Sequence, residues 1–402
     1  MKKRTGLKYA VMILLLLVGI SACGAGIYFL FTDLTLTFTE ENPEFLVGEK
    51  RRALDFVAET NGAVTAEKKR LDTSLPGEKE MVYTVKKDFR TKDFVFRYTV
   101  TENVPPKVLR TGDGVVLERG TKFDIDQVIS YGDNLDPAPK LRLKGKVDMD
   151  KNGTYPLTAI VKDACGNKTK WDFTVEVADS VPYYEDTRPR TSFADFRNAN
   201  AGKDRSFGID VSVWQGDIDF QKVRAAGCEF VIIRIGYSEK GTVTEDSKFR
   251  QNFERARKAG LKVGIYLFSE DASDQEIRSS ARWVLKQLDG AKLDLPIAFD
   301  WENYQNFQVY GVDFRTMNGL YDAFADEVGK GGYECMLYGS KIYLEDLWED
   351  RDTRIIWLAH YADETDYKGR FMLWQKADTG RIDGIEGDVD LNILYSKDIS
   401  GK

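Results

Sequence analysis

The chain has 402 residues, of which 42% are hydrophobic and 12% aromatic, so we expect a folded protein of about two to four domains. The net charge of −7 argues against a broad nucleic-acid-binding face, because such a face is basic. A single histidine, His360, excludes a multi-histidine zinc site, so any catalysis has to depend on carboxylates.

The N-terminus predicts a membrane anchor. A basic start, Met1-Lys2-Lys3-Arg4, precedes an apolar segment at 7–31 whose only charge is Lys8. This length suffices to span a bilayer, and the basic flank predicts that the rest of the chain lies outside the cell. A competing reading is a lipoprotein cleavage box ending at Cys23, although the segment stays apolar beyond that cysteine. In both readings the chain is tethered to the outer face of a bacterial membrane, most simply a Gram-positive one.

Two small β-sandwich modules are expected next, at 35–104 and 105–178. Both stretches alternate apolar and polar residues in runs of about 5–8, separated by short polar turns. Pro105-Pro106 marks the joint between them. The modules resemble bacterial immunoglobulin-like surface modules, for which a spacer role is the simplest expectation. The polar, aperiodic stretch 179–205 predicts a linker.

Strands and helices alternate from Phe207 onward, which predicts a C-terminal domain at 206–398. The apolar runs are 207–213, 230–237, 262–269, 295–302, 334–340, 354–360, 371–375 and 388–395. The helix-period segments are 217–226, 245–259, 273–288, 313–330 and 340–348. This order predicts a parallel α/β barrel of eight strands and five helices, in which the last strands join through hairpin-like turns.

Acidic residues follow the apolar runs at the positions where barrel enzymes carry their chemistry. In "LPIAFDWEN" (295–303), Asp300 and Glu302 end the fourth run, two residues apart and therefore on one face of a strand. Asp210 ends the first run, and Asp390 lies near the start of the last. The carboxyl ends of barrel strands meet at one mouth, so these four acids are expected to converge there. A solvent-exposed rim would instead carry mixed charges, including lysine and arginine.

Aromatic and amide side chains accompany the acids at the predicted mouth. They are Tyr266, Phe268, Tyr338, Trp357, Tyr361, Trp374 and Gln375. Rings stack on sugar faces and paired carboxylates hydrolyse glycosidic bonds, so this combination indicates a carbohydrate-cleaving site.

The ordered motifs of this region resemble glycoside hydrolase family 25, the lysozyme family of fungal and phage muramidases. They are "FGIDVSVWQG" (207–216), "FVIIRIGY", "GIYLFS", "PIAFDWEN", "MLYGS", "WLAHYA", "LWQ" and "VDLN". The resemblance spans about 206–396. It implies a barrel of eight strands and five helices, and cleavage of the β-1,4 bond between N-acetylmuramic acid and N-acetylglucosamine in peptidoglycan.

The resemblance also implies roles for the acids. Glu302 matches the general acid/base that protonates the leaving oxygen. Asp300 matches a neighbouring acid that steadies the substrate's N-acetyl group or the developing positive charge. Asp210 and Asp390 match acids at the floor of the site that hold substrate and tune Glu302. The family's stereochemistry implies retention of configuration with help from the substrate's acetamido group.

Two other functions are weighed against a muramidase. A non-catalytic wall-binding scaffold would have lost at least one of the four acids, and a chitin-type hydrolase would share the site but cleave another N-acetylated glycan. A metal-dependent deacetylase needs several histidines and is excluded. We expect no cofactor and no metal, peptidoglycan strands and the membrane as partners, and no nucleic acid; protein partners stay open. Cys228 and Cys335 can pair only if the fold brings them together.

Overall fold

The computed structural model describes residues 12–21, 23, 33–110 and 114–400, and the chain divides into two compact units, Met1–Asn103 and Val104–Lys402. Among these residues no helix is long and apolar enough to cross a membrane. Residues 12–21 are helical, and apart from Cys23 the rest of the predicted 7–31 segment lies outside the described residues.

The first unit contains a four-stranded sheet of order β2-β6-β5-β4 and a two-stranded sheet, β1-β3. Its strands are β1 (Leu36–Phe38), β2 (Glu44–Leu46), β3 (Val57–Thr60), β4 (Ala63–Ala66), β5 (Gly77–Lys87) and β6 (Arg90–Thr101), with a 3₁₀ turn, η1 (Ala53–Phe56). Alternate residues of β6 such as Phe96 and Tyr98 are buried, as are Tyr83 and Val85 of β5. The period of two thus gives each strand one face in the core.

The second unit begins with a similar small module. A four-stranded sheet has the order β10-β11-β12-β8, and a two-stranded sheet pairs β7 with β9. The elements are β7 (Lys107–Arg110), β8 (Val115–Glu118), η2 (Ile125–Gln127), β9 (Ser130–Gly132), β10 (Lys140–Lys144), β11 (Gly153–Lys162) and β12 (Lys168–Ala178). Leu157, Val161, Phe173 and Val175 form the centre of its core.

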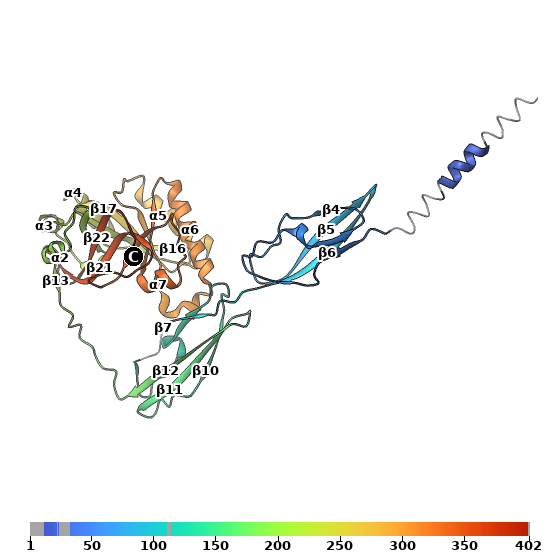
Figure 1. Ribbon diagram of the computed structural model, residues 1–402. Coiled ribbons are helices and arrows are strands. Elements are labelled where there is room, and N and C mark those ends of the chain that lie inside the picture. The colour runs from blue at the N-terminus through green and yellow to red at the C-terminus, as the bar shows by residue number, and fades with distance from the viewer. Residues whose placement is uncertain (1–11, 22, 24–32, 111–113, 401–402) are drawn as a thin grey trace, which may run out of the picture. The chain divides into compact units, whose positions relative to one another are not determined.

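A closed barrel forms the rest of the second unit (Figure 1). Its strands are β13 (Thr191–Ser192), β14 (Arg205–Val211), β15 (Phe230–Glu239), β16 (Thr242–Glu245), β17 (Lys262–Ser269), β18 (Ile297–Asp300), β19 (Cys335–Ser340), β20 (Ile355–Ala359), β21 (Arg370–Arg381) and β22 (Val389–Ser400). Strands β14, β15, β17, β18, β19, β20 and β21 pair in parallel along the ring, and β22 closes it by pairing antiparallel with both β14 and β21. Strand β16 lies off the ring and pairs antiparallel with β15. The ring needs a glycine at 208, because a Cβ there would lie 2.4 Å from the Phe230 carbonyl oxygen.

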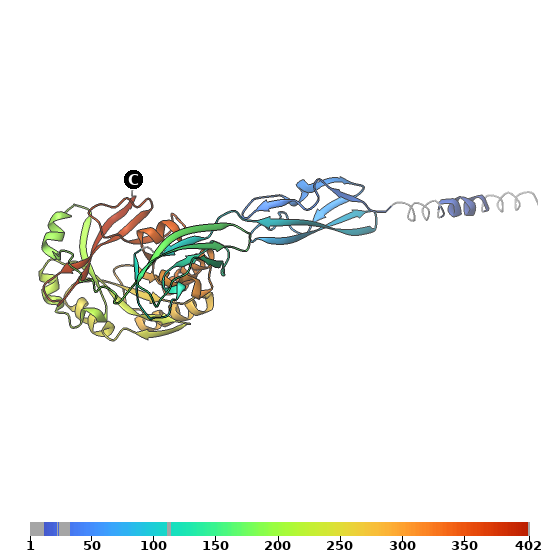
Figure 2. The ribbon, with the colours of Figure 1, turned by 90° about the horizontal axis from the view of Figure 1, so that it is seen from below.

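Six α-helices belong to this domain, and they lie outside the strands (Figure 2). They are α2 (Phe193–Ala199), α3 (Phe220–Ala225), α4 (Phe249–Lys258), α5 (Asp274–Leu288), α6 (Phe314–Lys330) and α7 (Lys341–Asp346), joined by the short η3 (Val213–Gln215) and η4 (Tyr304–Tyr310). The predicted N-caps are confirmed, since Ser273 accepts the Glu276 N–H and Asp313 accepts the Thr316 N–H.

The predicted fold class needs correction. The chain was expected to hold a transmembrane helix and a barrel of eight strands and five helices. The described residues contain no such spanning helix, and the observed sheet is richer in strands, with ten. The extra strands β13 and β16 have two and four residues, too few for alternation to reveal them. Strand β13 and helix α2 also fall inside the predicted linker, where Phe193 and Phe196 are buried.

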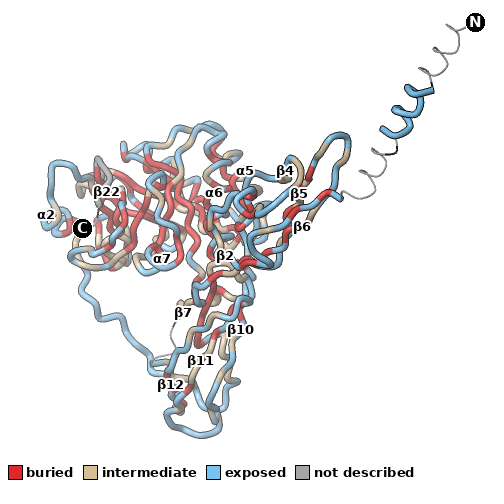
Figure 3. Tube along the Cα trace, turned by 45° about the vertical axis from the view of Figure 1, so that its right-hand side comes forward, coloured by how far each residue is buried: buried red, intermediate tan, exposed pale blue. Residues whose placement is uncertain are grey.

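Burial separates the barrel from the true connecting segment (Figure 3). The barrel strands are largely buried, as parallel strands covered on both faces must be. Residues 179–190 are almost entirely exposed, so the connecting segment is about half as long as predicted. All four cysteines are free, and the Cys228 thiol instead donates to the Phe230 carbonyl oxygen.

Candidate active site

Strand periodicity places acids at one end of the barrel interior. In β18, Ile297 and Phe299 pack outward toward the helices, whereas Ala298 packs inside the barrel and Asp300 follows it on that face. In β14, Asp210 follows the outward Ile209 and pairs directly with Asp390 of β22. Because β22 runs antiparallel, the start of this strand lies beside the end of β14.

The four predicted acids line one pocket of about 440 Å³. Glu302 lies just past the end of β18, so the strand is shorter than predicted, yet the carboxyl still reaches the pocket. The other lining residues are Val211, Ser212, Trp214, Gln215, Arg234, Tyr237, Tyr266 and Phe268. The structure therefore brings together Asp210, Asp300, Glu302 and Asp390 with two of the seven predicted companions, Tyr266 and Phe268.

Behind this pocket, a buried hydrogen-bond network holds Asp210. Its Oδ2 accepts from Gln375 Nε2 at 3.0 Å and from Asn392 Nδ2 at 2.7 Å. Gln375 Oε1 in turn accepts the hydroxyls of Tyr338 and Tyr361, each at 2.9 Å. Such a network fixes the orientation of the carboxylate that it surrounds.

Two predicted tryptophans also lie outside the pocket lining. Trp357 is buried inside the barrel and donates its indole N–H to Asn392 Oδ1, which makes it part of the network behind Asp210. Trp374 packs outward and donates to the His360 carbonyl oxygen. Its neighbour Gln375 faces inward, and consecutive residues of a strand cannot share one face. Substrate contact by Trp374 therefore gains no support from the geometry.

Burial raises the proton affinity of the acids. It raises the pKa of Asp300 well above the usual range, and the nearby charges of Glu302 and Asp210 add to the effect. Burial also raises the pKa of Asp390 to about 9, helped by the Asp210 charge and a hydrogen bond between the two carboxyls. Packed carboxyl groups of like charge resist joint ionisation, so the site holds protons at neutral pH.

Glu302 is the acid suited to donate a proton. Its side chain opens to solvent, unlike Asp210 and Asp300, which are only 6% and 4% exposed. The surrounding chain desolvates it, and together with the Asp210 charge this raises the pKa of Glu302 to about 7. A carboxyl that is accessible and half-protonated near pH 7 matches the requirement for a general acid.

Two lining residues escaped the sequence reasoning. Arg234 is the only cation among the described residues that line the pocket, and its guanidinium forms a 2.8 Å ion pair with buried Asp246. The sequence feature that could have identified Arg234 is its place in an otherwise apolar run, two residues after Ile232, which faces the barrel interior. Trp214 follows β14 and is 82% exposed at the pocket edge. A tryptophan within the motif at 207–216 was the signal that could have identified it.

The proton affinity of Asp300 predicts a pH-dependent gain in stability for Asp300→Asn. The folded state binds this proton more tightly than the unfolded chain, so its stabilising contribution is present at acid pH and lost as pH rises. Asn does not titrate, so its burial does not become more costly as pH rises. In the described part of the chain, Asp300 Oδ1 also has no hydrogen-bond partner that the substitution would remove. We expect Tm to rise by roughly 2–8 °C at pH 8 and by less at pH 5.

The control for this change is Asp383→Asn, which alters an exposed aspartate of the same domain. Calorimetry of both variants at the two pH values decides the outcome. An equal shift at pH 5 and pH 8, or a loss of stability at pH 8, would contradict the assigned protonation of Asp300.

Comparison with known protein families finds a match to the barrel domain. Residues 209–385 match the family model described as glycosyl hydrolases family 25. This match covers most of the barrel and agrees with the family resemblance that the motifs carry. The expected enzyme class, a glycoside hydrolase, is supported by the same match.

Several curated proteins and solved structures are similar to parts of the chain. The autolytic lysozyme of Clostridium acetobutylicum is 28% identical over 187 residues, which cover 46% of this chain and 54% of that protein. Lysozyme M1 of Streptomyces globisporus is 28% identical over 198 residues, covering 46% and 66%. A family 25 glycosyl hydrolase structure from Bacillus anthracis is 22% identical with a TM-score of 0.43, covering 49% and 92%. The chain thus spans about half the length of the first of these relatives.

Proposed function

We propose that this protein is a muramidase, which cleaves the β-1,4 bond between N-acetylmuramic acid and N-acetylglucosamine in peptidoglycan. The observation that carries the proposal is the single pocket with four carboxyls, one of them accessible and with a pKa near 7. Relatives named lysozyme support the substrate class. A solved autolysin of Streptococcus pneumoniae, 22% identical over 59% of this chain with a TM-score of 0.43, is described in complex with a synthetic peptidoglycan ligand.

In the proposed mechanism, Glu302 donates its proton to the glycosidic oxygen as the bond breaks. Asp300 accepts the N–H of the muramic acid's acetamido group through Oδ1, which has no partner among the residues that the structure describes, and the acetamido oxygen is left free to bond to the anomeric carbon as the glycosidic oxygen leaves. Asp210 and Asp390 share a hydrogen bond at the floor and raise the proton affinity of the site. Glu302, ionised after its transfer, then takes a proton from the incoming water.

Product analysis tests the reaction. The full-length protein is incubated with purified peptidoglycan, and the released fragments are reduced and weighed by mass spectrometry. Fragments that end in reduced muramic acid support the muramidase, whereas reduced glucosamine ends would indicate cleavage of the other glycosidic bond. Release from chitin oligosaccharides instead would move the assignment to a chitin-type hydrolase.

A non-catalytic wall-binding scaffold remains the second candidate function. The observation that favours catalysis over it is the retention of all four acids around one pocket. Binding of peptidoglycan without release of any fragment in the same assay would support the scaffold.

Substrate contact by Trp214 gives a test of recognition that is separate from catalysis. Its exposed ring at the pocket edge is placed to stack on a sugar face, so Trp214→Ala should weaken binding by about 1–2 kcal/mol. We expect KM to rise roughly 5- to 30-fold with little change in kcat. Trp171→Ala, which removes a partly exposed tryptophan from the second module, is the matched control. An unchanged KM for Trp214→Ala would remove this residue from the binding surface.

We further propose that the enzyme acts on the cell wall while tethered at the outer face of the cytoplasmic membrane. The support is the basic start and the apolar sequence at 7–31. Fractionation of cells, followed by protease treatment of intact protoplasts, tests it. Full-length protein that stays with the membrane and is digested from outside agrees with the tether, and release into the medium contradicts it.

A further inference from the structure

The second module is joined to the barrel through the segment that directly follows Glu302. Ser130 of β9 is completely buried, and its hydroxyl donates to the Tyr304 carbonyl oxygen at 2.6 Å. The same hydroxyl oxygen accepts the Phe307 N–H at 3.1 Å. One side chain of the module thus satisfies two backbone groups of η4, which begins two residues after the proposed general acid.

Close packing extends this contact at the next glycine. A Cβ at Gly132 would lie 2.6 Å from the ring of Phe314 and 2.7 Å from the ring of Phe307, so only glycine fits there without a shift. The Asp133 carbonyl oxygen accepts the Phe314 N–H at 2.9 Å, at the start of α6. Gln308 of η4 reaches back to the module and donates to Asp126 Oδ1 at 3.1 Å.

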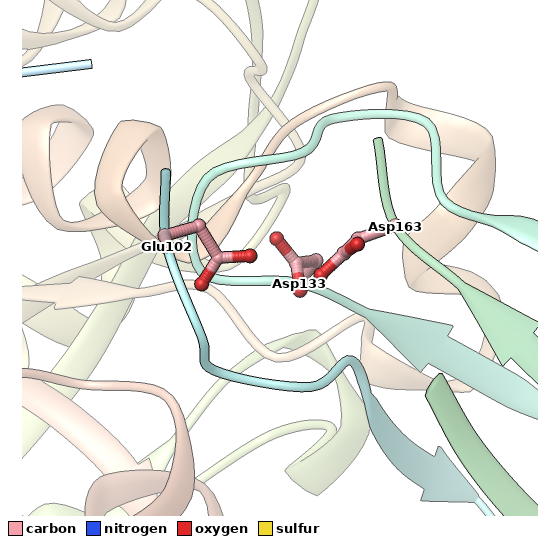
Figure 4. A group of neighbouring side chains, drawn as sticks. All are labelled: Glu102, Asp133 and Asp163. Carbon is pink, nitrogen blue, oxygen red and sulfur yellow. The ribbon is translucent and has the colours of Figure 1, made fainter. Parts of the chain in front are cut away.

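Asp133 fixes the turn that carries this interface. It is 1% exposed, and its Oδ1 accepts the N–H groups of Leu135 and Asp136 at 2.9 and 2.7 Å. Its carboxylate lies close to that of Asp163, with one oxygen of each within 4.8 Å (Figure 4). Asp163 in turn accepts the Gly166 and Asn167 N–H groups of the β11–β12 turn. Side-chain hydrogen bonds of Asp133 and Asp163 thus brace two neighbouring turns of the module, and the Asp133 turn carries the contact with the barrel.

A packed aromatic path leads from the module to the catalytic acids. Trp301, between Asp300 and Glu302 in sequence, is completely buried and contacts the rings of Tyr304 and Phe307 edge-on, at centroid distances of 5.4 and 5.8 Å. Its indole N–H donates to the Asp271 carbonyl oxygen at 3.1 Å, which fixes the other side. The residues that Ser130 and Gly132 hold are thus the residues against which Trp301 packs.

We propose that the module at 104–178 is a positioning element of the active site, in which Ser130 and Gly132 hold the 304–307 segment and thereby fix Trp301 and the adjoining Glu302. This inference rests on the proposed muramidase function and replaces the expected role of a simple spacer. Neither residue touches the pocket, so both act through η4. Displacement of a catalytic group by about 1 Å can cost on the order of 100-fold in rate, which makes such support functionally important.

The first test uses Gly132→Ala in the full-length protein. The added methyl group pushes on Phe307 and Phe314, so kcat should fall about 10-fold or more while KM changes less than about twofold. A loosened segment admits water around Glu302, which lowers its pKa from about 7 toward the ordinary value. The alkaline limb of the pH–rate profile should therefore move to lower pH by roughly half a unit or more. Gly319→Ala in α6, where a Cβ meets nothing within 4 Å, is the matched control.

The second test uses Ser130→Ala, which leaves the Tyr304 carbonyl oxygen and the Phe307 N–H without their buried partner. We expect kcat to fall and the alkaline limb of the pH–rate profile to move to lower pH, as in Gly132→Ala. The control is Thr121→Ala, which removes an exposed hydroxyl of the same module. Circular dichroism verifies the folding of each variant. If Gly132→Ala does not fold, the result for Ser130→Ala tests the inference. Variants with the kcat and pH profile of their controls would overturn the inference, whereas a wild type without muramidase activity would overturn the proposed function instead.

Discussion

Glu302→Gln should reduce the rate of peptidoglycan cleavage by about 100- to 10,000-fold and leave the fold intact. The amide has nearly the same shape as the carboxyl but cannot donate an acidic proton, and general acid catalysis contributes about 10²–10⁴-fold in rate. Glu302 has no packing role that the change would disturb, because its side chain opens to solvent. The measurement is the rate of appearance of reduced muramic acid ends, with Tm recorded for both proteins.

Glu386→Gln is the matched control, since it alters an exposed glutamate of the same domain outside the pocket lining. It should retain the wild-type rate. Cleavage by Glu302→Gln within about tenfold of wild type would exclude Glu302 as the general acid and leave Asp300 or Asp390 to be examined.

Asp210→Asn should lower kcat by about 100-fold and move the pH profile. In the wild type, activity should decline as pH rises through about 7, because Glu302 must be protonated to act. The Asp210 charge is one of the two causes that raise the pKa of Glu302, so its removal lowers that pKa. The alkaline limb should therefore shift to lower pH, and kcat/KM measured between pH 4 and 9 checks the direction.

Two features make this variant interpretable. Asn retains an oxygen that can accept from Gln375 and Asn392, so the buried network has a partner for both amides. Asp383→Asn removes a negative charge from the surface of the same domain and should leave the profile unchanged. A limb that stays at the wild-type pH in Asp210→Asn would mean that burial alone sets the pKa of Glu302.

Sequence reasoning located the acids because strand ends carry a local signal. An apolar run that ends in Asp300 and Glu302 reports both the burial of the strand and the polarity of its end, and parallel connection brings such ends to one rim. Helix caps behaved in the same way, since Ser273 and Asp313 act on backbone groups three residues away. Strand ends and helix caps depend on residues close together in the chain, so a single sequence can reveal them.

The companions of the acids were harder to predict because alternation within a strand decides which side chains enter the barrel. Tyr338, Trp357 and Gln375 face the barrel interior. Their hydrogen bonds, however, place them in the network behind the pocket and not in its lining. Arg234 lines the pocket, although its charge made it an unlikely member of an acidic site by residue type alone. How deep a side chain lies below the surface depends on residues from distant strands, so it cannot be predicted from one sequence.

The sequence by itself located four acids at strand ends, the motifs that resemble the matched family, and the period-two and helical patterns of the elements. Only the tertiary structure decided how the ring closes through β22, which side chains lie behind Asp210, and that Ser130 and Gly132 of the second module hold the segment after Glu302. The physical reason is that proton affinity and positioning arise from burial and contacts between residues more than 170 positions apart.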